Sequence, residues 1–188
     1  MCGDNMCAKG LEALLAVNGI ELSSAYEALY EALRLQCFAQ ICDALKENKY
    51  EYTQALHLYR QQKNHAIFAE EMVRKYCPYR LEQDSYEVLG ELFKAFFRRD
   101  GVRITYPDSL RRKLAFQQNY RCPMCGKEIS HMAHLDHIIP WTYVGDMLEN
   151  NLQLLCGDCN IKKNASVIYP LQVLLQRGNM MESVPHSA

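Results

Sequence analysis

The chain has 188 residues, and its 21 lysine and arginine side chains nearly balance 22 aspartate and glutamate side chains, which gives a net charge close to zero. About half of the residues are apolar and 23% are charged, which is typical of a soluble globular protein. No apolar run is long enough to cross a bilayer, and the first ten residues lack the pattern of a signal peptide. We therefore exclude a membrane protein and expect a cytoplasmic one.

Helix-forming residues dominate the first hundred positions. Apolar side chains recur every three or four residues over 26–45, which predicts one amphipathic helix. The same pattern over 50–76 predicts a second helix that ends near Pro78, and a third is expected over about 84–99. This region, residues 1–100, carries no catalytic constellation. We expect it to dock a protein partner or to mediate self-association.

The chain is basic from residue 98 to residue 127, and this segment includes a short β-prone stretch at 102–106. It has eight basic side chains and only two acidic ones, Asp100 and Asp108; the basic residues are Arg98, Arg99, Arg103, Arg111, Arg112, Lys113, Arg121 and Lys127. A helix is expected over about 108–120, and its Arg111, Arg112 and Lys113 are candidates for binding nucleic-acid phosphates. The alternative is that these side chains form an ordinary solvated helix face.

Nine cysteines are present, and four of them form two CxxC pairs, Cys122 with Cys125 and Cys156 with Cys159. Two such pairs supply the four thiolates of a tetrahedral structural zinc site. We expect the other five to be reduced thiols. A zinc ion closed in by four cysteines has no open position for water, so any chemistry has to come from the residues between the two pairs.

That insert contains the sequence HLDHIIPW at 134–141, in which Asp136 and His137 are adjacent. Neighbouring side chains on a strand point to opposite faces, so one of the two can hold a metal ion while the other faces a water molecule. A histidine with an ordinary pKa is able to act as a base at neutral pH.

Several elements now occur in a characteristic order: Cys122-x-x-Cys125, Asp136-His137-Ile138-x-Pro140, and Asn151-Leu152-x-x-Leu155-Cys156-x-x-Cys159-Asn160-x-x-Lys163. Over roughly residues 108–165 this order resembles the HNH endonuclease family. The resemblance implies a ββα-metal unit, in which two strands and a helix surround one divalent ion. We therefore expect a mostly α chain with a small α+β module: a helical N-terminal region, a zinc-stapled ββα-metal HNH module over 101–178, and a flexible tail at 179–188.

The resemblance also implies roles for four residues. His137 is the general base that activates water, and Asp136 is a ligand of the catalytic metal. Asn151 braces the loop that holds His137. Asn160 occupies the position of the last metal ligand, and its amide oxygen suits Mg²⁺ or Mn²⁺.

The function implied is hydrolysis of phosphodiester bonds in DNA, with double-stranded DNA as the first candidate, leaving a 5′-phosphate and a 3′-hydroxyl. Lys162 and Lys163 follow Asn160 in the sequence and are expected to contact phosphates. The chain departs from many family members at Gly145-Asp146, where those members have two glycines. Two alternatives stay open: an effector nuclease of a restriction or antiphage defence complex, and a non-catalytic zinc-dependent DNA-binding or adaptor module.

Overall fold

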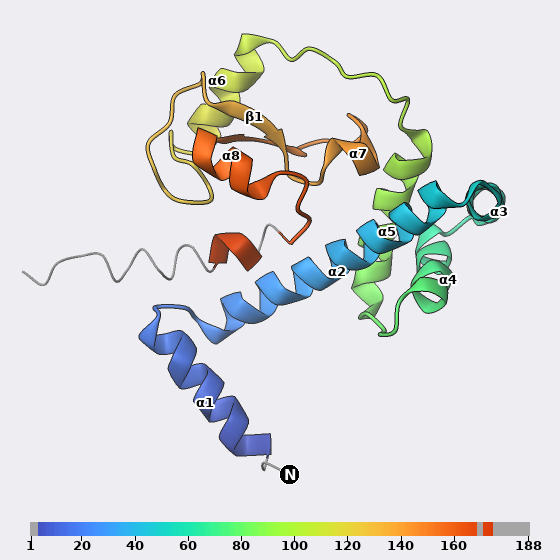
Figure 1. Cartoon of the computed structure of the whole chain (residues 1–188), viewed down its shortest axis with the longest axis horizontal. Helices are drawn as coiled ribbons and strands as arrows, with labels where there is room; N and C mark the ends of the chain where they lie inside the picture. Colours follow the sequence, from blue (N-terminus) through green and yellow to red (C-terminus); the bar gives the residue numbers. More distant parts are fainter. Residues whose placement is uncertain (1–3, 169–170, 175–188) are drawn as a thin grey trace, which may run out of the picture.

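The computed structural model describes residues 4–168 and 171–174 (Figure 1). Helices dominate it, with one small two-stranded antiparallel sheet and a cluster of four cysteines, so the predicted fold class is confirmed. None of the helices in the described residues has the length and apolarity needed to cross a membrane. The tail predicted at 179–188 lies outside the described residues.

Five helices make up the N-terminal half: α1 (Asp4–Val17), α2 (Leu22–Glu47), α3 (Lys49–Gln61), α4 (His65–Tyr76) and α5 (Gln83–Arg98). The long α2 runs diagonally through the molecule, and its second half packs against α3, α4 and α5 (Figure 1). The helices expected around 26–45 and over 84–99 are therefore present.

The segment 50–76 forms two helices where the sequence predicted one. Three polar residues, 62–64, separate α3 from α4. The side chain of Asn64 accepts a hydrogen bond from the Ala66 amide at 2.9 Å and so caps the start of α4. Asn48 caps α3 in the same way. The apolar periodicity continues across the break because both helices face one core, whereas the caps fix where each helix starts.

Aromatic rings fill the core between these helices. Phe38, Phe68, Phe93 and Phe96 are fully buried, and the ring of Phe93 lies 5.2 Å from that of Phe38 and 5.3 Å from that of Phe68 in edge-to-face contacts. Such contacts bury large apolar surfaces in a favourable geometry. The core therefore fixes α2, α4 and α5 against one another.

The C-terminal module contains α6 (Asp108–Gln117), β1 (His134–His137), α7 (Trp141–Val144), β2 (Leu152–Leu155) and α8 (Gly157–Lys163). The two strands pair antiparallel, so that Asp136 lies opposite Gln153 and His137 lies opposite Leu152. A small second core contains the motif cysteines together with Ala115, Met124, Ile129, Leu154 and Leu155.

A long extended segment joins α5 to α6 and arcs along one side of the molecule (Figure 1). It includes the β-prone residues 102–106, which form no strand. A strand needs a neighbouring strand, and this segment instead directs the Ile104 amide to the carboxylate of Asp146 at 3.4 Å.

The module and the helical half share the larger core through α7. Val144 is fully buried in that core. Next to it, the Tyr143 hydroxyl donates to Asp43 at 2.8 Å, and the Tyr143 ring lies 6.1 Å from that of Phe38. The division into residues 1–100 and 101–178 remains a prediction, and α7 is the point where the two parts meet.

This shared core predicts that Val144→Ala destabilises the whole chain. Removing two buried methyl groups and leaving a cavity should lower the free energy of unfolding by about 2 kcal/mol. Urea unfolding followed by circular dichroism measures the change. Val102→Ala is the matched control, since Val102 is 63% exposed, and its effect should stay within about 0.5 kcal/mol. Equal effects of the two variants would contradict the shared core.

Candidate active site

The four motif cysteines converge at one point of the C-terminal module. The Sγ atoms of Cys122, Cys125, Cys156 and Cys159 all lie within 4.8 Å of one another. The first pair sits on a tight turn in which the Gly126 amide donates to the Cys122 carbonyl at 2.8 Å. The second pair sits at the start of α8. Four sulfur atoms at this spacing could hold one tetrahedral metal ion, as the sequence predicted.

The surroundings of these thiols suit metal binding. Burial opposes ionisation of Cys122, but hydrogen bonds from the backbone at positions 156, 125 and 124 outweigh it and hold its pKa below the ordinary value. Burial, followed by the neighbouring thiols, raises the pKa of Cys159. Sulfur atoms so close together repel once ionised, and a bound cation relieves that repulsion. The donor set therefore fits zinc.

A cleft of about 710 Å³ is lined by residues of β1, α7 and α8. Three of the residues that the sequence singled out, Asp136, His137 and Asn160, line it together. Arg103 and Trp141 line it as well, with the Arg103 guanidinium 4.8 Å from the centre of the indole ring. The cleft thus combines oxygen ligands, a titratable ring and a cation.

Asp136 is held by two neighbours. Gln153, its partner across the sheet, donates from Nε2 to Oδ2 at 2.9 Å, and the Lys163 ammonium lies 3.0 Å from the same oxygen. The Lys163 side chain is fully buried and also donates to the backbone carbonyl of His137 at 2.7 Å. The expectation that Lys163 contacts phosphates is therefore corrected: this ammonium joins α8 to β1 inside the module.

His137 meets a residue that the motif did not single out. Its Nε2 atom lies 2.8 Å from Oδ1 of Asp146, whose side chain is only 7% exposed. The Tyr106 hydroxyl donates to the same carboxylate, and the Trp141 indole N–H donates to it at 2.9 Å. Asp146 and Trp141 lie in the β1–β2 connection, His137 ends β1, and Tyr106 lies in the extended segment before α6.

The carboxylate of Asp146 is ionised under ordinary conditions. Burial alone would raise its pKa, but the donors Tyr106, Trp141, His137 and the Ile104 amide outweigh burial and lower the pKa to about 2. Burial and the bond to Asp146 raise the pKa of Tyr106, so its hydroxyl keeps the proton that it donates. The sequence marked Asp146 only as a departure from the two glycines of many family members, and its contacts with Ile104 and Tyr106 span about forty positions of the chain.

Asn151 forms hydrogen bonds with the two residues that follow His137. Its side-chain oxygen accepts from the Ile139 amide at 2.8 Å, and its side-chain nitrogen donates to the Ile139 carbonyl at 2.9 Å. Its own carbonyl accepts from the Ile138 amide at 2.9 Å. This buried asparagine therefore fixes both residues after His137 to the start of β2.

The predicted DNA-binding side chains differ in exposure. Arg112, Lys113 and Lys162 are exposed. Arg111 is half-buried and donates to the Ala133 carbonyl at 2.9 Å, which ties α6 to the turn before β1. The α6 residues thus include both a structural contact and exposed cations.

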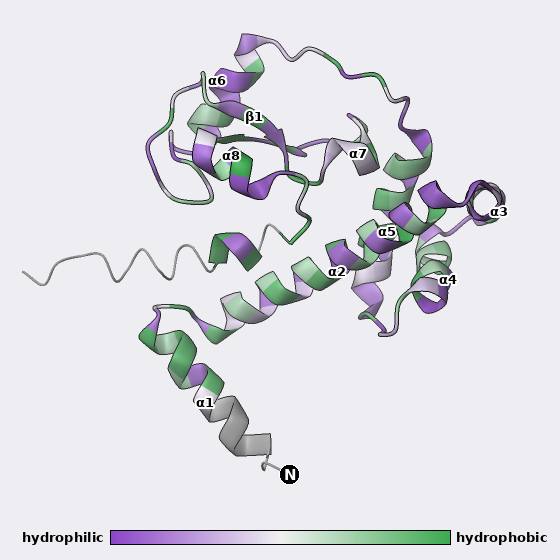
Figure 2. Cartoon of the chain, viewed as in Figure 1, coloured by the Kyte–Doolittle hydropathy of each residue, from purple (hydrophilic) through white to green (hydrophobic). Residues whose placement is uncertain are grey.

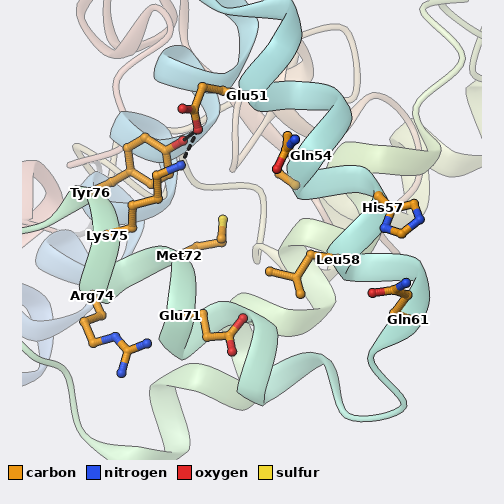
Figure 3. A pocket seen from close by; sticks show the side chains of 11 residues that line it. Glu51, Gln54, His57, Leu58, Gln61, Glu71, Met72, Arg74, Lys75 and Tyr76 are labelled. Carbon is orange, nitrogen blue, oxygen red and sulfur yellow. Dashed lines mark hydrogen bonds and ion pairs between the residues drawn. The ribbon is translucent and has the colours of Figure 1, made fainter.

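A second cavity, of about 520 Å³, lies in the helical half between α3 and α4 (Figure 3). Glu51 accepts hydrogen bonds there from Lys75 and from the Tyr76 hydroxyl. The lining residues include no group of metal ligands within the described part of the chain. We place the candidate site in the cleft at β1, where ligands and a base meet.

Two short antiparallel strands followed by a helix, with a four-cysteine cluster at one end and an Asp-His pair at the other, make up a ββα module. Residues 122–166 match the family model of HNH endonucleases, which agrees with the resemblance seen in the sequence. Comparisons with curated proteins and with solved structures found no match.

The cysteine cluster predicts that purified protein carries about one tightly held zinc per chain. Cys156→Ser removes one of the four sulfur ligands, so zinc should be lost and the C-terminal module should unfold, because a structural metal supplies much of the folding energy of a small module. Elemental analysis and circular dichroism measure both effects.

Cys77→Ser is the control for the zinc experiment, since Cys77 is a half-buried cysteine of the helical half that lies outside the cluster. It should keep the wild-type zinc content. A zinc-free wild-type chain whose module is nevertheless folded would contradict the structural role of the metal.

Proposed function

We propose that this protein is a metal-dependent endonuclease that hydrolyses phosphodiester bonds of DNA, with double-stranded DNA as the main substrate. The observation that carries the proposal is the cleft in which Asp136, His137 and Asn160 meet, within the segment that matches HNH endonucleases. A module that only binds DNA needs none of these three side chains at one cleft. Their convergence therefore favours hydrolysis over the alternative of a zinc-dependent binding or adaptor module.

In the proposed reaction a water molecule attacks the phosphorus atom while His137 accepts one of its protons. The new bond joins the water oxygen to phosphorus, and the bond from phosphorus to the 3′ oxygen breaks. The 3′ oxygen takes a proton from solvent, so the products are a 5′-phosphate and a 3′-hydroxyl. Asn151 serves this step indirectly, since its three hydrogen bonds fix the backbone just after His137.

Asp136 and Asn160 would hold the catalytic divalent cation, and an oxygen-only ligand pair favours Mg²⁺ or Mn²⁺. When bound, this cation neutralises negative charge on the phosphate and on the leaving oxygen. Lys163 offsets part of the charge of Asp136. Two protein oxygens do not fill the coordination shell of Mg²⁺, so the phosphate of the substrate would supply further ligand oxygens, which is common for Mg²⁺ sites.

The exposed cations around the module are the proposed DNA contacts. Arg112 and Lys113 project from α6, Lys162 from α8, and Arg103 from the rim of the cleft. Arg111 adds charge next to them while it ties α6 to the turn before β1. Such contacts bind the phosphate backbone without reading base sequence, so we expect little sequence preference from these side chains.

The helical half is proposed to dock a protein partner or a second copy of the chain. Apolar residues recur along α1 and the first half of α2 (Figure 2). The large apolar side chains that are exposed there are Leu11, Leu14, Val17, Leu22, Tyr26, Leu29 and Leu33. An exposed apolar patch of this kind is typical of an interaction site. Recruitment through it suits an effector nuclease of a restriction or antiphage defence system. A cytoplasmic setting suits the free cysteines described.

The proposed reaction predicts opposite responses of two neighbouring variants to added metal. His137→Ala removes the base and should slow plasmid nicking by about 100- to 10,000-fold. Asp136→Ala weakens the metal site, so its loss of activity should be partly reversed by a higher Mn²⁺ concentration. The same increase should not restore His137→Ala, because a metal ion does not replace a positioned base. Nicking assays across a metal titration measure both.

His131→Ala is the matched control, because His131 lies in the turn before β1 and does not line the cleft. It should cut like the wild type, and all variants should keep the wild-type zinc content and circular dichroism spectrum. If His137→Ala cuts at the wild-type rate, the proposed mechanism is wrong. If the wild type does not cut with Mg²⁺, Mn²⁺ or Ni²⁺, the binding-module alternative replaces the proposal.

The proposed contacts of α6 predict a change in salt dependence. Arg112→Ala combined with Lys113→Ala removes two phosphate contacts and should reduce the slope of log affinity against log salt by about 2. Fluorescence anisotropy with labelled duplex DNA at several salt concentrations measures this slope. The control pair is Arg60→Ala with Lys63→Ala at the end of α3, where both side chains are exposed. Equal slopes for the two double variants would rule out α6 as a DNA contact.

A further inference from the structure

The contact between Asp146 and His137 is not explained by packing alone. His137 ends β1 and Asp146 follows α7 within the β1–β2 connection, and Oδ1 of Asp146 lies 2.8 Å from Nε2 of His137. The side chains are only 7% and 20% exposed, so water competes weakly for this hydrogen bond. A buried carboxylate on the ring of the proposed base is placed to affect the chemistry of that base.

Asp146 is itself held in place from two directions. Trp141, at the start of α7, donates to Oδ2 at 2.9 Å, and Tyr106 donates to Oδ1 from the segment before α6. Gly145 makes the turn between α7 and Asp146 with a φ of +57°, a conformation that favours glycine. A Cβ atom at position 145 would also lie 3.1 Å from the Cβ of Arg99. The carboxylate is thus fixed before substrate arrives.

Its effect on His137 follows from hydrogen-bonding rules. An ionised carboxylate only accepts hydrogen bonds, so Nε2 of the neutral His137 ring has to carry the proton. Nδ1 then has an unshared electron pair and is the nitrogen that accepts a proton from water. Once His137 is protonated, the carboxylate also stabilises the positive ring.

We infer that Asp146 is a positioning residue that fixes the tautomer and the orientation of His137 for proton transfer from water. This inference rests on the proposed nuclease function. Tyr106 and Trp141 contribute to this positioning, since their hydrogen bonds orient the Asp146 carboxylate toward the His137 ring.

The kinetic test uses the full chain with Asp146→Asn, which keeps the shape of the side chain and removes its charge. We expect kcat to fall at least about 10-fold and up to about 10,000-fold, the cost of removing the carboxylate that orients a histidine base, with KM for DNA unchanged. Asp146→Ala is the second variant and should fall at least as far. Glu149→Gln is the matched control, because Glu149 is an exposed carboxylate in the same connection and should cut like the wild type.

A second measurement needs no activity. In nitrogen-15-labelled wild-type protein without DNA, the Nε2 proton of His137 should give a downfield resonance that exchanges slowly with water. The resonance is assigned by its absence in His137→Ala. It should persist in Glu149→Gln and disappear in Asp146→Ala, where no acceptor shields the proton. If Asp146 did not accept the hydrogen bond of Nε2 in solution, the resonance would be unchanged in Asp146→Ala.

The outcomes distinguish a failure of the proposed nuclease function from a failure of the role inferred for Asp146. A wild-type chain that never cuts overturns the proposed function and this inference with it. A wild-type chain that cuts no faster than Asp146→Asn and Asp146→Ala overturns the inference alone. The inference also fails if these variants lose zinc or DNA affinity while kcat is kept, or if the His137 resonance is unchanged in Asp146→Ala.

Discussion

The closure of two distant turns around four sulfur atoms is the constraint on which the site depends. β1 and β2 have four residues each, and a strand pair of that length is not stable by itself in water. The sulfur atoms of the two CxxC turns converge within 4.8 Å and hold α8 against the sheet. The buried Lys163 then joins α8 to β1 through Asp136. A strand pair that is otherwise marginal can therefore present the two candidate site residues Asp136 and His137 in a fixed geometry.

The helical half supplies what the small module lacks. Its core accepts Val144 and the ring of Tyr143, and so anchors the connection between the two strands. That connection begins just after His137 and contains both Trp141 and Asp146. Bonds from the extended segment before α6 reach the same carboxylate. The proposed base is thus supported by three separate stretches of chain, and only one of them carries the recognisable motif.

Local patterns made the metal-binding and motif residues predictable, because a CxxC turn or an Asp-His pair carries its chemistry within a few positions. Contacts between distant residues were not predictable in this way. Asp146 reaches Tyr106 across forty positions of the sequence, and no periodicity announces that pairing. Lys163 looked like a phosphate contact because lysines are rarely buried, yet Asp136 compensates its charge inside the module. The stretch 102–106 has strand-forming residues but no neighbouring strand to bond with.

The position of α7 in the larger core has a consequence for the newly made chain. The N-terminal residues leave the ribosome first during synthesis, so α2 to α5 are available to pack before residues 122–166 have all emerged. The connection that carries Asp146 then has a surface on which to settle as soon as it appears. A degraded chain that lacks the helices leaves Val144 without its neighbours and the connection without its anchor. C-terminal fragments released during turnover should therefore hold Asp146 and His137 less firmly than the full chain does.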